Sequence, residues 1–465
     1  MTTQKSRSIL ASEDRKASAF DAMRRKTLKS LLFGSGYIGL RALATGLPAS
    51  LLLAPQQAQA NDACGATASV PQYLIFATSA AGDPMNCNVP GTYDDAAIVH
   101  AADPKMAKTA MTLGSSVVQA AQVWAGASAM LRNNLCFVHH STGRNAHPDE
   151  PVVLRLNGKL ARAEMLPSYF SRQLAPCFQT VQREPVALGA ENGLEQPVFE
   201  GRALPRLSPI ALRDTLLSPT GPLATANLVA MRDRHLDQLR TALKTGGNPA
   251  QLAFIDRLAT SQQSVRKISQ GLLGQLASID GRDPVKDQIT AATVLIAMNV
   301  APVITIHLPF GGDNHTDGNL AKEISEHTSS IAALDFLSQQ LNMLRFADNT
   351  LLADRVSLAV INVFGRTLKP ATPNGREHWP NHHVTVFYGK RFLPSVIGGV
   401  KPGAGDYTAR GINSQSGQPD DAGDIPPSES LTAVAKTLGA ALGIPEATLN
   451  TDISGGKIIR PALAP

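Results

Sequence analysis

The chain has 465 residues and a formal net charge of +6, from 43 basic and 37 acidic side chains. Residues 1–60 hold nine of the basic groups and three of the acidic ones, so the remaining residues hold 34 of each and are formally neutral. The excess positive charge therefore belongs to the N-terminal segment, and the charge balance of the remainder does not argue for a nucleic acid or an anionic membrane as its partner.

The first sixty residues have the three parts of an export signal, in the expected order. The pair Arg24-Arg25 is followed by Leu28 and Lys29, which is the twin-arginine pattern. An apolar stretch over 31–54 is interrupted by glycines, Arg41 and a proline, too broken for a stable membrane span. The segment ends in Ala-Gln-Ala at 58–60, a small-x-small cleavage site. We predict a signal peptide over 1–60, the twin-arginine translocase as export partner, and a periplasmic or secreted mature protein with no membrane span. The alternative is a chance arginine pair before a buried helix.

The four cysteines all lie beyond the predicted signal, at Cys64, Cys87, Cys136 and Cys177. An oxidising compartment permits up to two disulfides, and four cysteines permit three pairings. Four independent buried thiols are the alternative. The spacings contain no CxxC pair that would indicate a zinc knuckle or a redox site.

The mature chain, 61–465, alternates short β-branched runs with helical patterns. This order predicts an α/β fold with a mostly parallel sheet flanked by helices. The predicted strands are Gln72–Thr78, Leu135–His140, Val303–Leu308, Val356–Val363 and Val384–Tyr388.

Helical periodicity between and after these strands predicts the layers that cover the sheet. Leucines at helical spacing over about 222–282 indicate a helical insertion, broken by Gly-Gly-Asn-Pro at 246–249. Asp283-Pro284 is a helix start, because aspartate suits the N-cap and proline the first turn. Further helices are expected from about Asn319 and near Leu431–Leu442. Residues 401–430 are rich in Gly, Pro, Asp and Ser and predict a long surface loop.

Polar clusters follow the first two strands, where ligands collect in open α/β sheets. Asp83 follows the first strand and is either a hard-metal ligand or a turn-capping residue. The loop after the second strand, ending at His147, offers Ser141 and Thr142 as candidate nucleophiles and Arg144 as a binder of phosphate or sulfate. The alternative for this loop is a set of polar side chains with structural hydrogen bonds.

Two later clusters carry more ligand-type residues. Asp313 and His315 follow the strand at Val303 as Asp-x-His, after two glycines, which is a plausible half of a metal site. His378 and His382 lie in the segment 375–383, which holds three histidines, a glutamate and an arginine. Arg366, just upstream, is a second candidate for binding an anionic substrate.

These residues resemble a known family. Phe364-Gly365-Arg366-Thr367 with a following Gly-x-x-His, and the upstream Gly-x-Asp-x-His, resemble domain-of-unknown-function family 1501, which is similar to the alkaline phosphatase and sulfatase superfamily. Gly82-Asp83-Pro84-Met85-Asn86 looks like the opening motif of that family. The resemblance covers roughly residues 70–460, and the twin-arginine leader is also typical.

The resemblance implies an alkaline-phosphatase-like core in which metal ions flank a nucleophile and a phosphoryl or sulfuryl group. It implies metal ligation by Asp83, Asp313, His315 and His378, with a divalent metal, zinc in the first place, as cofactor. The chain departs from the family pattern at Val363, where a glutamate is usual, and at Trp379. Valine cannot bind a metal, so one metal site is expected to be incomplete.

Two functions follow as hypotheses. The first is a metal-dependent hydrolase of phosphate or sulfate esters, with a small-molecule ester as substrate. The second is a catalytically degenerate binding or assembly protein on the same scaffold. Fold similarity alone does not decide between them; convergence of the predicted ligands on one centre would favour the hydrolase.

Overall fold

The structure is a computed structural model of the chain. It describes residues 70–217 and 270–465, except 163, 179, 181, 190–196 and 371–373, together with 238 and 241. The predicted signal peptide over 1–60 and most of the predicted insertion over 222–282 lie outside the described residues.

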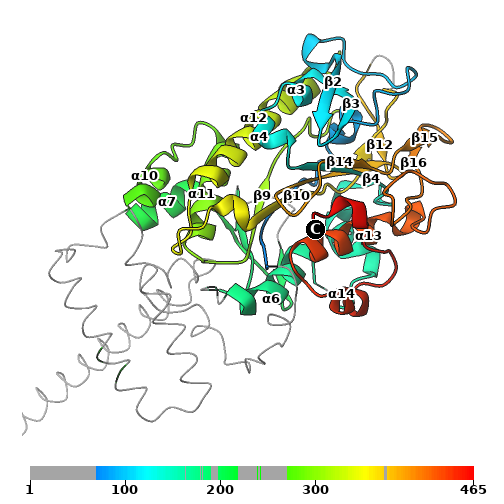
Figure 1. Ribbon diagram of the computed structural model, residues 1–465. Coiled ribbons are helices and arrows are strands. Elements are labelled where there is room, and N and C mark those ends of the chain that lie inside the picture. The colour runs from blue at the N-terminus through cyan, green and yellow to red at the C-terminus, as the bar shows by residue number, and fades with distance from the viewer. Residues whose placement is uncertain are drawn as a thin grey trace, which may run out of the picture.

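The centre of the fold is one eight-stranded sheet of order β14-β4-β13-β10-β1-β9-β5-β8 (Figure 1). Strands β1, β9 and β10 pair in parallel, and so do β5 with β8 and β9, and β14 with β4. Only β13 runs against its neighbours, β10 and β4. The predicted α/β fold with a mostly parallel sheet is therefore confirmed. The strands are β1 Tyr73–Thr78, β4 Leu135–His140, β5 Val186–Leu188, β8 Arg206–Leu207, β9 Val303–His307, β10 Val356–Val360, β13 His383–Tyr388 and β14 Ser395–Ile397.

Burial explains why these short runs form strands. Every residue of β1, β4, β10 and β13 is buried, which fits strands covered on both faces. Side chains alternate between two cores, so Tyr73 and Ile75 of β1 pack on one face while Leu74 and Phe76 pack on the other. The sheet is therefore the middle of three layers.

Helices α11 and α12 cover one face, and α6, α13 and α14 cover the other (Figure 1). Helix α11 begins as predicted, because the Asp283 side chain accepts a hydrogen bond from the Lys286 amide and Pro284 occupies the first turn. The predicted helices after Asn319 and near Leu431 are α12 and α13. The α-helices are α3 Gln122–Ala125, α4 Ala129–Arg132, α5 Glu150–Leu154, α6 Leu166–Phe178, α7 Pro209–Leu217, α10 Gln270–Ala277, α11 Pro284–Ala297, α12 Ala321–Met343, α13 Pro427–Ala441 and α14 Glu446–Asp452.

The segment 401–430 is more ordered than a surface loop, so that prediction was wrong. It holds most of a hairpin, β15 Val400–Pro402 with β16 Tyr407–Ala409, and the first residues of α13. Tyr407, Ile412 and Ile425 within it are buried. Its glycines and prolines therefore shape a packed segment. The other two-stranded ribbons are β2 Lys108–Leu113 with β3 Ser116–Ala121, β6 Val198–Phe199 with β7 Arg202–Ala203, and β11 Gly365–Arg366 with β12 His378–Trp379.

The cysteines do not form two disulfides. Cys87 and Cys136 are buried free thiols, and Cys177 is disulfide-bonded. Cys64 lies outside the described residues. The disulfide at Cys177 lies within the predicted limit of up to two, and the alternative of four independent thiols is wrong.

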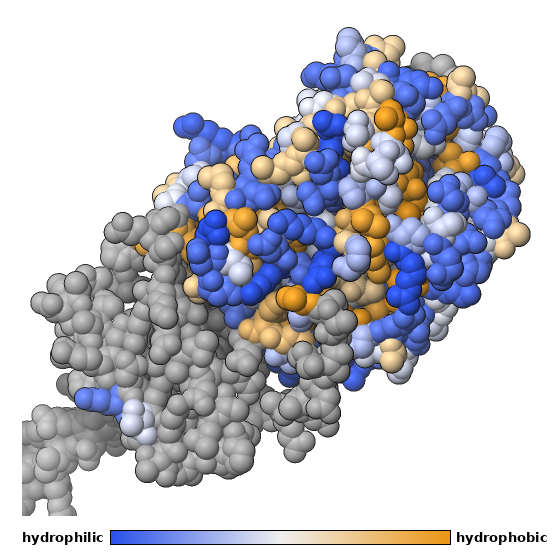
Figure 2. Space-filling view, viewed as in Figure 1, coloured by the Kyte–Doolittle hydropathy of each residue, from blue (hydrophilic) through white to orange (hydrophobic). Residues whose placement is uncertain are grey.

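The surface in the view of Figure 2 is mostly hydrophilic, with apolar residues in smaller patches between polar ones. This is ordinary for a folded protein, whose surface always retains apolar atoms. None of the described helices has the length and hydrophobicity that a membrane span requires.

Candidate metal centre

Four side chains from distant parts of the chain converge at the carboxyl edge of the sheet. His147 opens a short 3-10 helix after β4, Asp313 and His315 follow β9, and His378 lies in β12. Each offers one ligand atom, and these atoms lie within 4.8 Å of one another. Strands β4 and β9 run in the same direction and deliver their following loops to this edge, while the reversed β13 begins there, which brings in the segment before it.

Each of the three imidazoles is held by a hydrogen bond at its Nδ1 atom. The Nδ1 atoms of His147 and His378 bond the main-chain oxygens of Ala80 and Asn145 at 2.7 and 2.8 Å. Nδ1 of His315 lies 3.0 Å from a carboxylate oxygen of Glu377. Because these partners can only accept, each Nδ1 carries a proton; a ring that carries no second proton has its lone pair on Nε2, which in His315 also faces an N–H group of Arg366 at 3.3 Å. Such outer partners hold metal-binding histidines in their ligand tautomer.

The Nε2 atoms are turned toward one another and toward Asp313. Nε2 of His147 lies 3.4 Å, and that of His315 3.3 Å, from the Asp313 carboxylate. Nε2 of His378 is buried and has no hydrogen-bond partner among the described residues. Burial lowers the pKa of His378, the bond to Asn145 opposes this, and the nearby charge of Arg366 lowers it further. The ring is therefore neutral at neutral pH, as a ligand must be.

The apolar ring of Phe364 packs against two of the three imidazoles. Its ring centroid lies 4.1 Å from that of His378 and 5.2 Å from that of His147. Gly82, with φ of +60°, allows this packing, because a Cβ there would lie 1.9 Å from the Phe364 ring. The rings above remain accessible, since the side chains of His147, His315 and Asp313 are 30%, 33% and 50% exposed.

The Arg366 side chain contacts Asp313 and His315 from within the protein. It does not face solvent, so its predicted role in substrate binding is wrong. Its side chain is fully buried, and one NH2 group donates to Asp313 at 3.0 Å. The remaining donors go to the carbonyl oxygens of Gly82, Ala81 and Arg376 and to Nε2 of His315. All five N–H groups are thus used within the protein. Burial would raise the pKa of Asp313, but the charge and hydrogen bond of Arg366 outweigh it and lower that pKa.

Asp83 and His382 were predicted as ligands and lie outside the group. Asp83 is fully buried, and one of its carboxylate oxygens accepts a hydrogen bond from the Gly312 amide at 2.5 Å. It therefore holds the loop that carries Asp313. His382 is also fully buried, with Nδ1 3.2 Å from the Asn86 amide and Nε2 3.0 Å from Nδ1 of His139. Both nitrogens of His382 are thus occupied by protein partners, which leaves no lone pair for a metal.

The candidate nucleophiles are not activated in the structure. The Ser141 hydroxyl donates to the Pro380 carbonyl at 2.7 Å, so it has no base as partner. Thr142 is buried, and no described residue hydrogen-bonds its hydroxyl. Nucleophilic catalysis needs a base or a metal at the hydroxyl, and the structure shows neither side chain beside a base. Arg144 is partly exposed, with Nε donating to the Asn157 side chain at 2.8 Å.

The sequence had not assigned two members of this constellation. His147 was recognised only as the end of a histidine-rich loop, and Glu377 only as a neighbour of His378. A signal for His147 exists in hindsight: it follows a buried strand in the same way as Asp313 does. No signal in the sequence alone indicates that Glu377 contacts His315.

The donor set fits a transition metal. Three imidazole nitrogens and one carboxylate suit zinc and its neighbours and not magnesium or calcium, which prefer all-oxygen sites. Zinc–nitrogen bonds of about 2.0–2.1 Å place tetrahedral donors about 3.3 Å apart. Because the four donor atoms already lie within 4.8 Å, small side-chain rotations suffice.

Comparison with known proteins gives no match, neither to a family model nor to a curated protein nor to a solved structure.

Proposed function

We propose that the protein binds one divalent transition metal, zinc in the first place, at His147, Asp313, His315 and His378, and uses it to hydrolyse phosphate or sulfate esters. The observation that carries the proposal is the convergence of three imidazoles, each with its Nδ1 proton bound and its Nε2 directed inward, on one carboxylate. Three of the four residues that the family resemblance implies as ligands are in this group.

The residues have distinct roles in the proposal. A bound divalent ion would supply Lewis acidity toward an ester oxygen. Asp313 provides the one anionic ligand, Arg366 fixes its direction, and Glu377 makes His315 a more basic ligand. Arg144, on the loop that ends at His147, remains the candidate for binding the anionic group of the substrate. The short motifs that resemble family 1501 and its alkaline-phosphatase-like relatives support the same reaction class.

Export belongs to the proposal as well. The twin-arginine pattern and the cleavage site predict a periplasmic or secreted protein, delivered by the twin-arginine translocase. The near-neutral charge of the mature chain gives no reason to expect a nucleic acid among its partners.

The test combines metal analysis with a substrate panel. Purified protein is analysed for bound metals, stripped with a chelator, reloaded with single divalent ions, and assayed with chromogenic phosphate and sulfate esters. We expect about one metal per chain and turnover that is lost in Asp313→Asn and kept in Asp149→Asn. Absence of a bound metal after reloading would overturn the proposal.

A second candidate function is metal-dependent binding without turnover. It is favoured by the placement of Ser141 and Thr142, neither of which contacts a base, and by Val363 in place of the usual glutamate of the resembled family. One tightly bound metal with no turnover on any ester in the panel would select this function over the hydrolase.

A further inference from the structure

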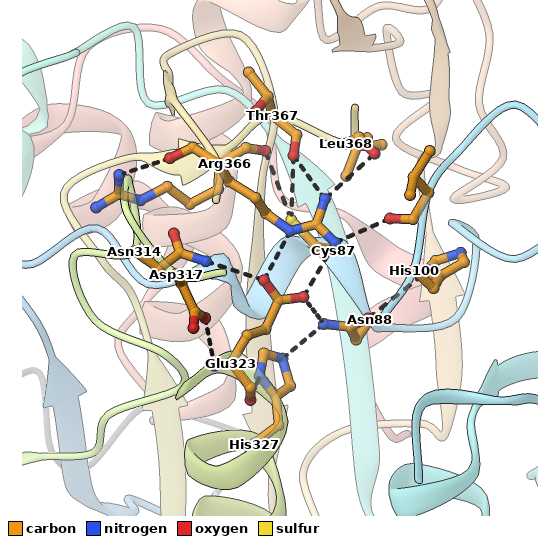
Figure 3. A network of polar contacts seen from close by, with 12 residues as sticks. Cys87, Asn88, His100, Asn314, Asp317, Glu323, His327, Arg366, Thr367 and Leu368 are labelled. Atoms are coloured by element: carbon orange, nitrogen blue, oxygen red, sulfur yellow. Dashed lines mark hydrogen bonds and ion pairs between the residues drawn. The ribbon is translucent and has the colours of Figure 1, made fainter. Parts of the chain in front are cut away.

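A buried ion pair lies next to the metal centre in the fold. Glu323, in the first turn of α12, lies within a network of polar contacts (Figure 3). Its ion-pair partner is Arg376, two residues before His378, and both side chains are fully buried. The guanidinium of Arg376 binds the carboxylate through two hydrogen bonds, Nε to Oε2 at 2.7 Å and an NH2 group to Oε1 at 3.1 Å. This is the forked geometry that only arginine provides.

The remaining hydrogen-bonding capacity of the pair is also used. The side-chain amides of Asn88 and Asn314 donate to the two oxygens of Glu323, at 2.6 and 3.0 Å. The other donors of Arg376 go to three main-chain carbonyls, those of Val99, Thr367 and Leu368. Because both oxygens of Glu323 and every N–H group of Arg376 are hydrogen-bonded, the pair holds its partners in one arrangement.

Asn314 and Arg376 itself connect the pair to the metal ligands. Asn314 stands between Asp313 and His315, and its carbonyl accepts a hydrogen bond from the Arg376 amide at 3.2 Å. Arg376 is followed by Glu377, which bonds His315, and then by His378. Gly375, with φ of +47°, permits the close approach, since a Cβ there would lie 1.7 Å from the Asn314 carbonyl oxygen. The network thus joins the segment 313–315 to the segment 375–378 at the residues adjacent to the ligands.

Stability alone does not account for such a pair. The free-energy cost of removing two charges from water is about as large as the free energy gained from their attraction. Replacing such a pair by apolar residues of similar volume often leaves the stability of the protein unchanged or increases it. A buried pair that is fully bonded is therefore better explained by the geometry it imposes than by the free energy of unfolding.

We propose that Glu323 and Arg376 are positioning residues for the metal centre: they fix the distance between the ligand segments 313–315 and 375–378 and thereby set metal affinity. The inference rests on the proposed metal binding and extends it to residues that touch neither metal nor substrate. It predicts that loosening the network weakens metal binding beyond what a general loss of stability would do.

The experiment uses two variants of the full chain and one control. Arg376→Lys keeps the charge and removes the fork. Asn314→Ala keeps the ion pair and removes the side-chain hydrogen bond that links it to the ligand segment 313–315, while the main-chain bond from the Arg376 amide to the Asn314 carbonyl remains. Thr437→Val is the control, because it removes buried hydrogen bonds, to the Ala433 carbonyl and from the Ile459 amide, in helix α13. Zinc affinity is measured by chelator competition, cobalt coordination by its visible absorption spectrum, and stability by urea unfolding of the metal-free protein.

We expect zinc affinity to fall about 10- to 100-fold in both variants, as for other residues that orient metal ligands, with an altered cobalt spectrum. The control should lose stability and keep both the affinity and the spectrum. Variants that fold and match the wild type in both readouts would overturn the inference, and Asn314→Ala alone decides if Arg376→Lys does not fold. If the wild type itself binds neither zinc nor cobalt, the proposed function fails first.

Discussion

At the scale of single residues, the candidate metal centre depends on acceptors that fix imidazole orientation. Main-chain oxygens of Ala80 and Asn145 and the Glu377 carboxylate each hold one Nδ1 proton. A histidine so held loses little rotational freedom on binding a metal, because its ring is already oriented. The acceptors come from three different segments, so each ring is positioned by a segment other than its own.

His147 gives the most direct test at this scale, because it was not assigned as a ligand from the sequence. His147→Ala removes one of four ligands from a partly exposed side chain, so we expect the fold to persist and zinc affinity to fall at least 100-fold. The measurement is chelator competition at pH 7.5. Asp149→Asn, in the same 3-10 helix, is the control and should bind zinc like the wild type. Unchanged affinity in His147→Ala would remove this residue from the centre.

Some residues of the candidate site could be predicted from their type and from their position at the end of a predicted strand. Asp313, His315 and His378 follow from ligand-type residues at predicted strand ends. Arg366 was assigned to substrate because its type suits an anion, but the sequence does not show that its side chain is buried and saturated. The assignment of Asp83 as a metal ligand failed because its carboxylate binds a main-chain amide that is distant in the chain, and the sequence does not show this contact.

At the scale of elements, the five predicted strands are the five central, adjacent strands of the sheet, β4, β13, β10, β1 and β9. They were predictable because strands buried on both faces are continuous apolar runs. The outer strands β5, β8 and β14 have only two or three residues each, too few for a recognisable pattern. The reversed direction of β13 could not be read either, because pairing direction depends on the path of the chain between strands.

The adjacent ends of β4 and β13 bury four histidines and predict acid sensitivity. Burial lowers the pKa of His139 and His140 to about 4 and lowers that of His382 and His383 as well. The unfolded chain, with an ordinary pKa near 6.5, binds more protons than the native state below that pH. Stability should therefore be complete above pH 6.5 and fall toward pH 4, by about 1.4 kcal/mol per pH unit for each such histidine.

Urea unfolding of the metal-free protein at pH 7.5, 6.0 and 5.0 measures this dependence. His140→Gln should reduce the slope by about one proton, since its Nε2 accepts from the Thr385 hydroxyl in the neutral form and a glutamine oxygen can replace it. An unfolding free energy that stays constant from pH 7.5 to 5.0 would show that these rings are not buried in neutral form.

Helix α11 offers a second test at this scale, of the cap that the sequence predicted. Asp283→Ala removes the acceptor of the Lys286 amide and should lower the free energy of unfolding by about 1 kcal/mol. Lys286→Ala breaks only the exposed ion pair with Asp283, at 3.3 Å, and should cost less than about 0.5 kcal/mol. Urea unfolding of both variants separates the two effects. Equal losses would assign the stabilisation to the ion pair and not to the cap.

At the scale of the whole molecule, the candidate metal centre is formed by parts of the chain that the sheet brings together. His147 follows a strand on one side of the sheet centre, Asp313 and His315 follow one on the other, and His378 enters ahead of the reversed strand. An ion bound by all four would add a link between these segments in the native state only, because the unfolded chain does not hold them together.

Metal removal should therefore destabilise the entire domain and not the site alone. At a free zinc concentration one hundred times the dissociation constant, binding to the native state contributes about 2.7 kcal/mol, and the contribution grows with the logarithm of zinc concentration. Thermal unfolding of the chelator-treated protein, with and without added zinc, measures it. The Asp313→Asn variant should unfold at a temperature that zinc changes much less, since a neutral amide replaces the anionic ligand. A wild-type midpoint that zinc leaves unchanged would mean that the four side chains do not hold a metal in the folded protein.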